Sequence, residues 1–267
     1  MSNNFSKDHQ IYLKRVKMKN NKILTTQIGL LIFALISWEV AARLNLIDTF
    51  LTSSPSSIWK LFIEYVLHGK LYYHVGISLF ETIAGFLLGT LLGVIIAILL
   101  WWSDFWARVL DPYMVILNSL PKTALAPIFI IWVGAGYKGI IVTAISVSVV
   151  VTIMNMFSSY KSVDEDKLRL LDTFGATKYQ VLRKVILPSS VPDLISTLKI
   201  NIGLSWVGVI VGEFLVSKAG IGYLIVYGMQ VFKLDLVMMN VMVLGFISAI
   251  MYRIIAVIEK RFTKWQK

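Results

Sequence analysis

The chain has 267 residues, of which 57% are hydrophobic and only 15% are charged, and its mean hydropathy is +0.74. This composition excludes a disordered chain, which would need more charge, and a typical soluble domain, in which roughly a quarter of the residues are charged. Cysteine is absent, which excludes disulfide scaffolds, thiolate catalysis and cysteine-based metal sites. The composition therefore indicates a polytopic membrane protein.

Six apolar stretches reach the length of about 20 residues that is needed to cross a hydrocarbon core of about 30 Å. Backbone groups in lipid have to be satisfied within the segment itself, so each stretch is predicted to be a helix. The predicted fold is therefore all-α, with six transmembrane helices. The stretches cover residues 23–42, 75–102, 112–133, 140–157, 194–215 and 236–258.

Lysine and arginine predict the orientation. If residues 1–22 are inside the cell, the inner segments carry eighteen of the 26 basic residues and the outer segments carry six. The positive-inside rule then predicts that both termini are cytoplasmic. Residues 1–22 are expected to be a basic arm near anionic lipid rather than a nucleic-acid-binding segment. Residues 23–260 form the predicted six-helix domain, and residues 261–267 form a cytoplasmic tail.

Several local patterns predict packing. Gly85, Gly89 and Gly93 recur every four residues, and a second pair of glycines with the same spacing lies at 208 and 212, so both segments are expected to pack closely on other helices. Glu39 lies four residues before Arg43, which predicts an interfacial ion pair. Residues 53–66 fit a short amphipathic helix, either on the membrane surface or packed on its neighbours.

The inner loop 158–192 is partly apolar, which lipid does not explain on the cytoplasmic side. Acidic residues at 164–166 are predicted to begin one helix, a bend follows at Gly175, and a second helix from Thr177 is expected to end at Pro188. This pattern favours either docking into a groove of a cytosolic protein or a self-packed hairpin. The residues expected to make such docking contacts are Leu171, Phe174, Gly175, Ala176, Thr177, Tyr179, Leu187 and Pro188.

Polar residues inside the predicted spans are costly in lipid and are therefore functional candidates. Pro121 is expected to kink the third span and to leave a carbonyl without a donor. Lys122 is expected to share a helical face with Asn118, and that face either lines a solute pathway or pairs structurally with a neighbouring acid. The candidate pathway residues are Asn118, Lys122, Asn201, Ser205 and Glu213.

Enzyme chemistry has little support in the sequence. The Gly134-Ala135-Gly136 segment follows a membrane span and lacks the third glycine of a dinucleotide loop. There is no GxxxxGK[ST] motif, so ATP-driven transport would require an ATPase in another chain. We therefore expect a non-enzymatic chain without a cofactor of its own, in which any ATP and Mg²⁺ are bound by a partner subunit.

The inner loop also resembles a known family. Gly175-Ala176, followed after eight residues by Val185-Ile186-Leu187-Pro188, resembles the signature loop of permease subunits in ATP-binding-cassette (ABC) importers. The Glu-Ala-Ala of that signature is absent from this chain, which has Arg169-Leu170-Leu171 at the aligned positions. Residues 117–136 and 203–225 are similar to the third and fifth spans of the nitrate/sulfonate/taurine branch. The resemblance covers about residues 75–260, with the spans in the same order.

The resemblance implies a type I ABC importer permease fold in which the inner loop is a coupling helix. It further implies a second permease copy, expected to make a homodimer, two cytosolic ATPase subunits and an external substrate-binding protein. The implied solute is small and polar or anionic, such as a sulfonate, nitrate, taurine or a vitamin precursor. The alternative is a stand-alone secondary transporter or channel, which should carry inverted repeats and several intramembrane carboxylates.

Overall fold

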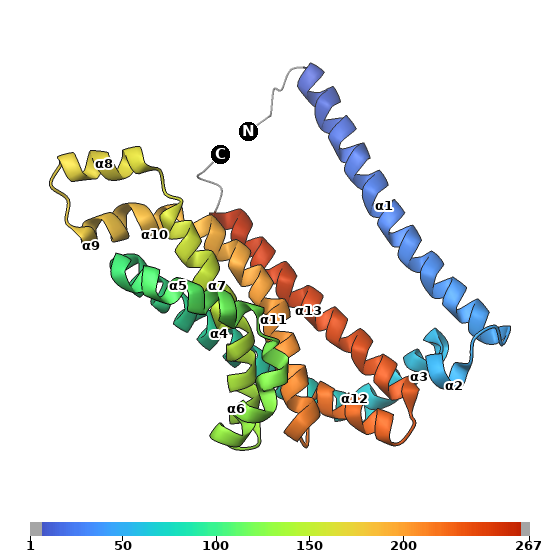
Figure 1. Ribbon diagram of the computed structural model, residues 1–267. Helices are drawn as coiled ribbons and strands as arrows, with labels where there is room; N and C mark the ends of the chain where they lie inside the picture. The colour runs from blue at the N-terminus through green and yellow to red at the C-terminus, as the bar shows by residue number, and fades with distance from the viewer. Residues whose placement is uncertain (1–6, 263–267) are drawn as a thin grey trace. The chain divides into compact units, whose positions relative to one another are not determined.

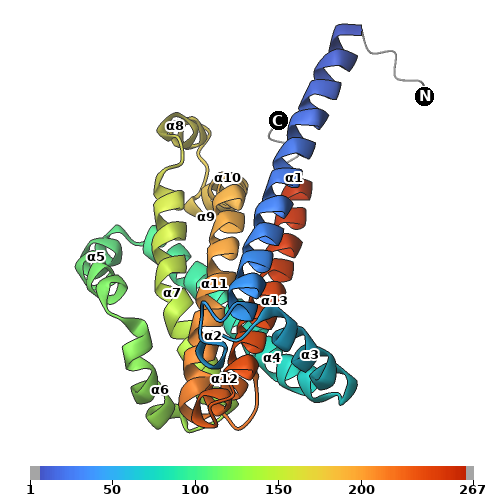
Figure 2. The same cartoon turned by 90° about the vertical axis from the view of Figure 1, so that its right-hand side faces the viewer.

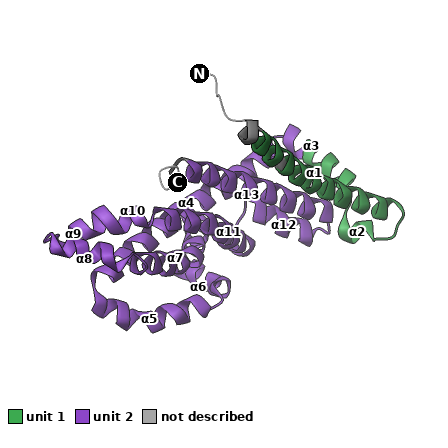
Figure 3. Ribbon diagram, turned by 90° about the horizontal axis from the view of Figure 1, so that it is seen from above, with its two compact units in different colours: residues 1–63 green, residues 64–267 purple. Residues whose placement is uncertain are grey.

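The computed structural model describes residues 7–262, and within this range the chain consists of helices and turns without a strand (Figure 1). The chain divides into two compact units, residues 1–63 and 64–267 (Figure 3). Residues 1–6 of the expected basic arm and residues 263–267 of the expected tail lie outside the described range. The predicted all-α fold is confirmed, with five helices in the described range long enough to cross a membrane, or six when one bent pair counts as a span.

In the first unit, the first predicted span lies within α1 (Lys7–Arg43), which continues back through the described part of the basic arm. At 1.5 Å per residue, its 37 residues extend over about 55 Å, well beyond a hydrocarbon core of about 30 Å. The predicted ion pair is confirmed, with Arg43 Nε 2.7 Å from Glu39 Oε1. Glu39 Oε2 also accepts a hydrogen bond from the Ser56 N–H in the first turn of α3.

Two short helices follow α1. The helix α2 (Thr49–Thr52) is capped by the carboxylate of Asp48, which accepts a hydrogen bond from the Phe50 N–H. The helix α3 (Pro55–Leu67) confirms the short amphipathic helix predicted for residues 53–66. Its proline is in the first turn, where a missing N–H has no consequence for the helix.

Four long helices in the second unit correspond to predicted spans: α4 (Lys70–Trp102), α7 (Tyr137–Lys161), α11 (Val191–Val216) and α13 (Leu234–Phe262). The ten-residue apolar helix α12 (Ile221–Gln230) follows α11. The sequence prediction treated this segment as an outer connection and missed its helix. Gly220, which has a φ of 119°, lies in the turn between α11 and α12.

The third predicted span is broken rather than continuous. It consists of α5 (Asp104–Ser119), the 3₁₀ turn η1 (Lys122–Leu125) and α6 (Ala126–Val133), and the two parts are bent by 87° (Figure 2). The expected proline kink is confirmed. The prediction that Asn118 and Lys122 share one helical face is wrong, because α5 ends between these two residues. Lys122 Nζ instead donates to the Asn118 main-chain carbonyl at 3.0 Å, which satisfies a group exposed by the break.

Glycines allow α4 to approach α7 closely, as the four-residue spacing predicted. A Cβ placed at Gly85 would lie 2.6 Å from the Ala144 Cβ, and one at Gly93 would lie 2.5 Å from the Thr152 Cβ. A Cβ at Gly208 of α11 would lie 2.5 Å from the Ala144 Cα. All three distances are too short for a real side chain, so both α4 and α11 depend on glycine where they pack on α7.

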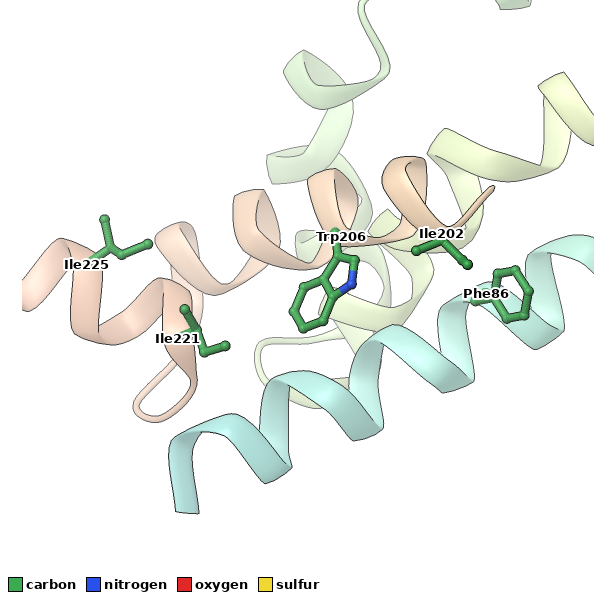
Figure 4. Close-up of a cluster of buried hydrophobic side chains, with 5 residues drawn as sticks. All are labelled: Phe86, Ile202, Trp206, Ile221 and Ile225. Carbon is green, nitrogen blue, oxygen red and sulfur yellow. The ribbon is translucent and has the colours of Figure 1, made fainter. Parts of the chain in front are cut away.

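A cluster of buried hydrophobic side chains joins α4, α11 and α12. Trp206 of α11 lies at its centre and packs between the other members, as Figure 4 shows. The short helix α12 contributes two isoleucines, so it is part of the core rather than a loose outer connection. The cluster consists of Phe86, Ile202, Trp206, Ile221 and Ile225.

We predict that Gly93→Ala destabilises the protein by about 1–3 kcal/mol, the usual range for overpacking. Thr152 cannot move aside easily, because its hydroxyl accepts a hydrogen bond from Asn201 at 2.8 Å. Thermal unfolding in detergent would measure the effect. The control is Gly76→Ala on the same helix, where a new Cβ would meet nothing within 4 Å. Equal melting temperatures for the two variants would contradict the close packing of α4 on α7.

Candidate functional site

The inner loop contains two helical segments separated by a glycine turn, as predicted. The helix α8 (Glu165–Thr173) begins at Asp164, whose carboxylate accepts a hydrogen bond from the Asp166 N–H. Gly175 has a φ of 69°, a conformation that glycine adopts without strain. The helix α9 (Lys178–Val181) then begins with a capping box, in which Thr177 and Gln180 bond each other's backbone N–H.

The second helical segment of the loop does not end at Pro188, so this part of the prediction is wrong. The chain continues from α9 through the π-helical turn η2 (Leu182–Ile186) into α10 (Leu187–Ser189). In the wider turn, the Leu187 N–H bonds the Leu182 carbonyl five residues earlier. A proline in the first turn of a helical segment needs no N–H, so Pro188 is accommodated just after the π turn.

Aromatic side chains are exposed at the tip of this loop. The side chain of Phe174 is 77% exposed and that of Tyr179 is 58% exposed, with the Gly175 turn between them. Leu170 is exposed on the same tip, whereas Leu171 and Ala176 are partly buried. Clustered exposed apolar side chains on a segment outside the predicted spans are typical of an interaction surface.

The part of the loop that follows the tip is firmly held. Leu182 and Ile186 are buried against Ala97 of α4 and against Met156 and Tyr160 of α7. Leu187, another predicted contact residue, packs on the same cluster.

A polar contact reinforces this anchor. Lys178 Nζ donates to the Trp102 carbonyl, the last residue of α4, at 2.6 Å and lies 5.4 Å from the centre of the Trp101 ring. A cation at the C-terminal end of a helix is favourable because the carbonyl groups there have no helical donor. The loop is therefore attached to the ends of both α4 and α7.

The candidate pathway residues on α11 lie inside the helical core. Asn201 is fully buried and donates from Nδ2 to Thr90 Oγ1 of α4 and to Thr152 Oγ1 of α7, both at 2.8 Å. Ser205, one turn further, is buried as well. This geometry supports interhelical hydrogen bonding by Asn201, while a role of these residues in the solute pathway stays a prediction.

Glu213, the third candidate on α11, is also buried and holds the start of α12. Its Oε1 accepts a hydrogen bond from the Ser78 hydroxyl at 2.5 Å, and its Oε2 accepts one from the Gly222 N–H at 2.6 Å. The Ser78 hydroxyl in turn accepts from the Ile221 N–H, and His74 Nδ1 accepts from the Gly220 N–H. These contacts satisfy N–H groups at the start of α12, which have no partner within the helix.

The contact of these α4 residues with Glu213 could not be predicted from the sequence. His74, Ser78 and Glu81 of α4 are more than 130 positions away from Glu213. Glu81 is 2% exposed and interacts with Glu213. The spacing of His74, Ser78 and Glu81 places them on one face of a helix, but it does not identify Glu213 as their partner. Asn118 and Lys122 lie apart from this network, at the break between α5 and α6.

Comparisons with known proteins agree with this architecture. A family model described as "binding-protein-dependent transport system inner membrane component" matches residues 89–264. The taurine transport system permease protein of Escherichia coli is 23% identical over 97% of this chain and 96% of its own. A Bacillus subtilis protein named as a candidate permease for aliphatic sulfonates is 28% identical over 89% of this chain and 87% of its own.

Solved structures show the same fold. A bacterial ABC transporter that imports the polysaccharide alginate contains a chain that matches with a TM-score of 0.67 and 14% identity, over 97% of this chain and all of that one. An inward-facing methionine ABC transporter matches with a TM-score of 0.64 and 18% identity, over 72% of this chain and 95% of the other. At these identities the likeness concerns the fold alone.

We predict that Glu213→Gln destabilises the protein by about 1–3 kcal/mol, the usual cost of buried donors that lose an acceptor. The amide can keep only one of the two acceptor positions that face Ser78 and Gly222. Thermal unfolding in detergent would measure the loss. The control is Glu165→Gln, because that side chain is 80% exposed and should change stability little. The same melting temperature for the two variants would contradict a role of Glu213 in holding α12.

Proposed function

The chain belongs to the family of binding-protein-dependent transport system inner membrane components and is an ABC transporter permease, and on this basis we propose how it couples and what it carries. The proposed complex lies in the bacterial cytoplasmic membrane, with both chain termini and the loop 158–192 on the cytoplasmic side. The excess of basic residues in the inner segments supports this orientation. Family membership also argues against the alternative of a stand-alone secondary transporter.

The exposed tip of the inner loop carries the proposal for coupling. Phe174 and Tyr179 project from a segment that is anchored to α4 and α7, so the tip is both available to a partner and mechanically connected to the membrane helices. A short helical element with apolar side chains fits a groove in a cytosolic protein. The proposed occupant of the loop surface is a cytosolic ABC ATPase subunit.

The ATPase subunits are proposed to supply the nucleotide chemistry, because the chain has no P-loop. Two of them, each with ATP and Mg²⁺, would dock on the loops of two permease copies. Approach of the two ATPases would then move the anchored loops and, with them, the inner ends of α4 and α7. Such a rigid-body motion can alternate access to a path between the two permease copies.

The proposed solute is small and polar or anionic. The names of the relatives refer to taurine, aliphatic sulfonates and formylaminopyrimidine, all of them small polar molecules. An external binding protein is proposed to deliver the solute to the outer face. Lys122 and Asn118 stay candidate pathway residues, because both lie at the break between α5 and α6 and are not fully buried.

We predict that Phe174→Ala lowers the affinity of the permease for its ATPase about tenfold or more, as expected when an aromatic anchor is removed from an interface. Folding should be unchanged, because the side chain is 77% exposed. The measurement is the amount of ATPase that copurifies with the tagged permease when the permease is expressed together with the genes that lie next to its own. ATP-dependent uptake in proteoliposomes should fall in parallel.

Trp132→Ala is the matched control for this experiment. Trp132 is also aromatic and 77% exposed, but it lies in α6, at the opposite end of the helical bundle from α8 (Figure 1). Its replacement should leave the bound ATPase unchanged. Full ATPase binding by the Phe174 variant, or solute transport by the permease alone without ATP, would overturn the proposed coupling.

A further inference from the structure

A polar groove runs between the inner halves of α7 and α11, apart from the coupling surface. Its volume is about 310 Å³, enough for a small organic solute. Seven of its eight lining residues are polar, which is unusual for a groove between two membrane-spanning helices. The lining residues are Asn155, Ser158, Ser159, Ser162, Asp193, Ser196, Thr197 and Ile200.

Contact with lipid is unfavourable for this polar surface. Ser158 and Ser196 are exposed within the two helices, and hydroxyl groups that face hydrocarbon lose the hydrogen bonds that water gives them. Many exposed positions elsewhere on the long helices carry large apolar side chains, such as Phe246 on α13 and Val207 farther along α11. The groove therefore suits water or a polar solute, and it opens near the inner loop that follows α7.

Asp193 gives the groove its charge. The Ser159 hydroxyl donates to Asp193 Oδ2 at 2.5 Å, which fixes the carboxylate and leaves Oδ1 able to accept a hydrogen bond from a solute. Among the described residues that line the groove, Asp193 carries the one carboxyl group.

The nearest basic side chains on the two helices are directed to other partners. Lys199 Nζ is 2.6 Å from Glu259 of α13, and the Lys161 ammonium lies over the Phe157 ring. The groove thus combines neutral hydroxyl and amide groups with one negative charge. Hydroxyl groups can donate to an oxyanion, whereas the carboxylate attracts a cation.

We propose that this groove is the inner part of the solute path and that it favours a small solute carrying both an amino group and an oxyanion. The amino group is recognised by Asp193, and the oxyanion by the hydroxyls of Ser158 and Ser196 and by the Asn155 amide. This inference rests on the proposed permease function and adds to it the solute class and the residues that contact the solute.

The absence of cysteine from the chain makes a direct test possible. Single variants Ser158→Cys and Ser196→Cys would be purified with the ATPase partners and treated with a charged, membrane-impermeant thiol reagent. The control is Gly245→Cys on α13, which is exposed but lies on an apolar face, so it should react slowly in a lipid nanodisc. The groove cysteines should react at least tenfold faster than the control.

Protection of the cysteines by an added solute distinguishes a solute path from a surface that only water reaches. The probes are 2-aminoethanesulfonate and ethanesulfonate, which differ in the amino group, added at millimolar concentration directly to the nanodiscs. We expect 2-aminoethanesulfonate to slow labelling severalfold and ethanesulfonate to have little effect. Asp193→Asn in the Ser196→Cys background should remove this difference, because the amide keeps a hydrogen bond to Ser159 but has no charge.

Three outcomes would overturn the inference: labelling as slow as at Gly245→Cys, labelling that neither probe slows, or equal protection by both probes. None of these depends on ATP-driven uptake or on delivery by the binding protein. Failure of the proposed coupling would be seen separately, as normal ATPase binding by the Phe174→Ala variant. The two proposals therefore fail in distinguishable ways.

Discussion

The close approach of α4 and α11 to α7 is the constraint on which the rest of the structure depends. Gly85, Gly93 and Gly208 leave no room for a methyl group against α7. At this separation, the short side chains of Thr90 and Thr152 reach the amide of Asn201, and three helices become joined by one hydrogen-bonded group. Small residues and polar groups replace the hydrophobic effect that joins helices in water, because lipid offers no such driving force.

The two ends of this three-helix core hold different segments of the chain in place. At one end, Glu213 and Ser78 hold the N-terminus of α12, so that the short helix packs its isoleucines on Trp206. At the other end, Ile186 and Lys178 fasten the inner loop to α4 and α7. A rigid core with a fastened loop is what coupling requires, because a loop that moved independently would transmit nothing to the membrane helices.

Features that depend on local periodicity could be predicted from the sequence, whereas features that depend on tertiary partners could not. Five of the predicted spans, the glycine spacing and the helix–glycine–helix inner loop are local patterns, and the structure confirms them. A kink near Pro121 was predicted, but its angle of 87° was not. The passage of the chain through Pro188 and the meeting of Ser78 with Glu213 are set by packing between segments distant in sequence, for which one sequence carries no signal.

The inner end of α7 connects the coupling surface with the polar groove. Met156 and Tyr160 pack against the anchor of the inner loop, whereas Asn155 and Ser159 of the same two turns line the groove. These two sets of residues lie on different faces of one helix. A displacement of the loop by the proposed ATPase partner would therefore turn or shift α7 as a unit and change the groove directly, without a relay through other segments. The carboxylate of Asp193 would move with it, because Ser159 holds that group to α7.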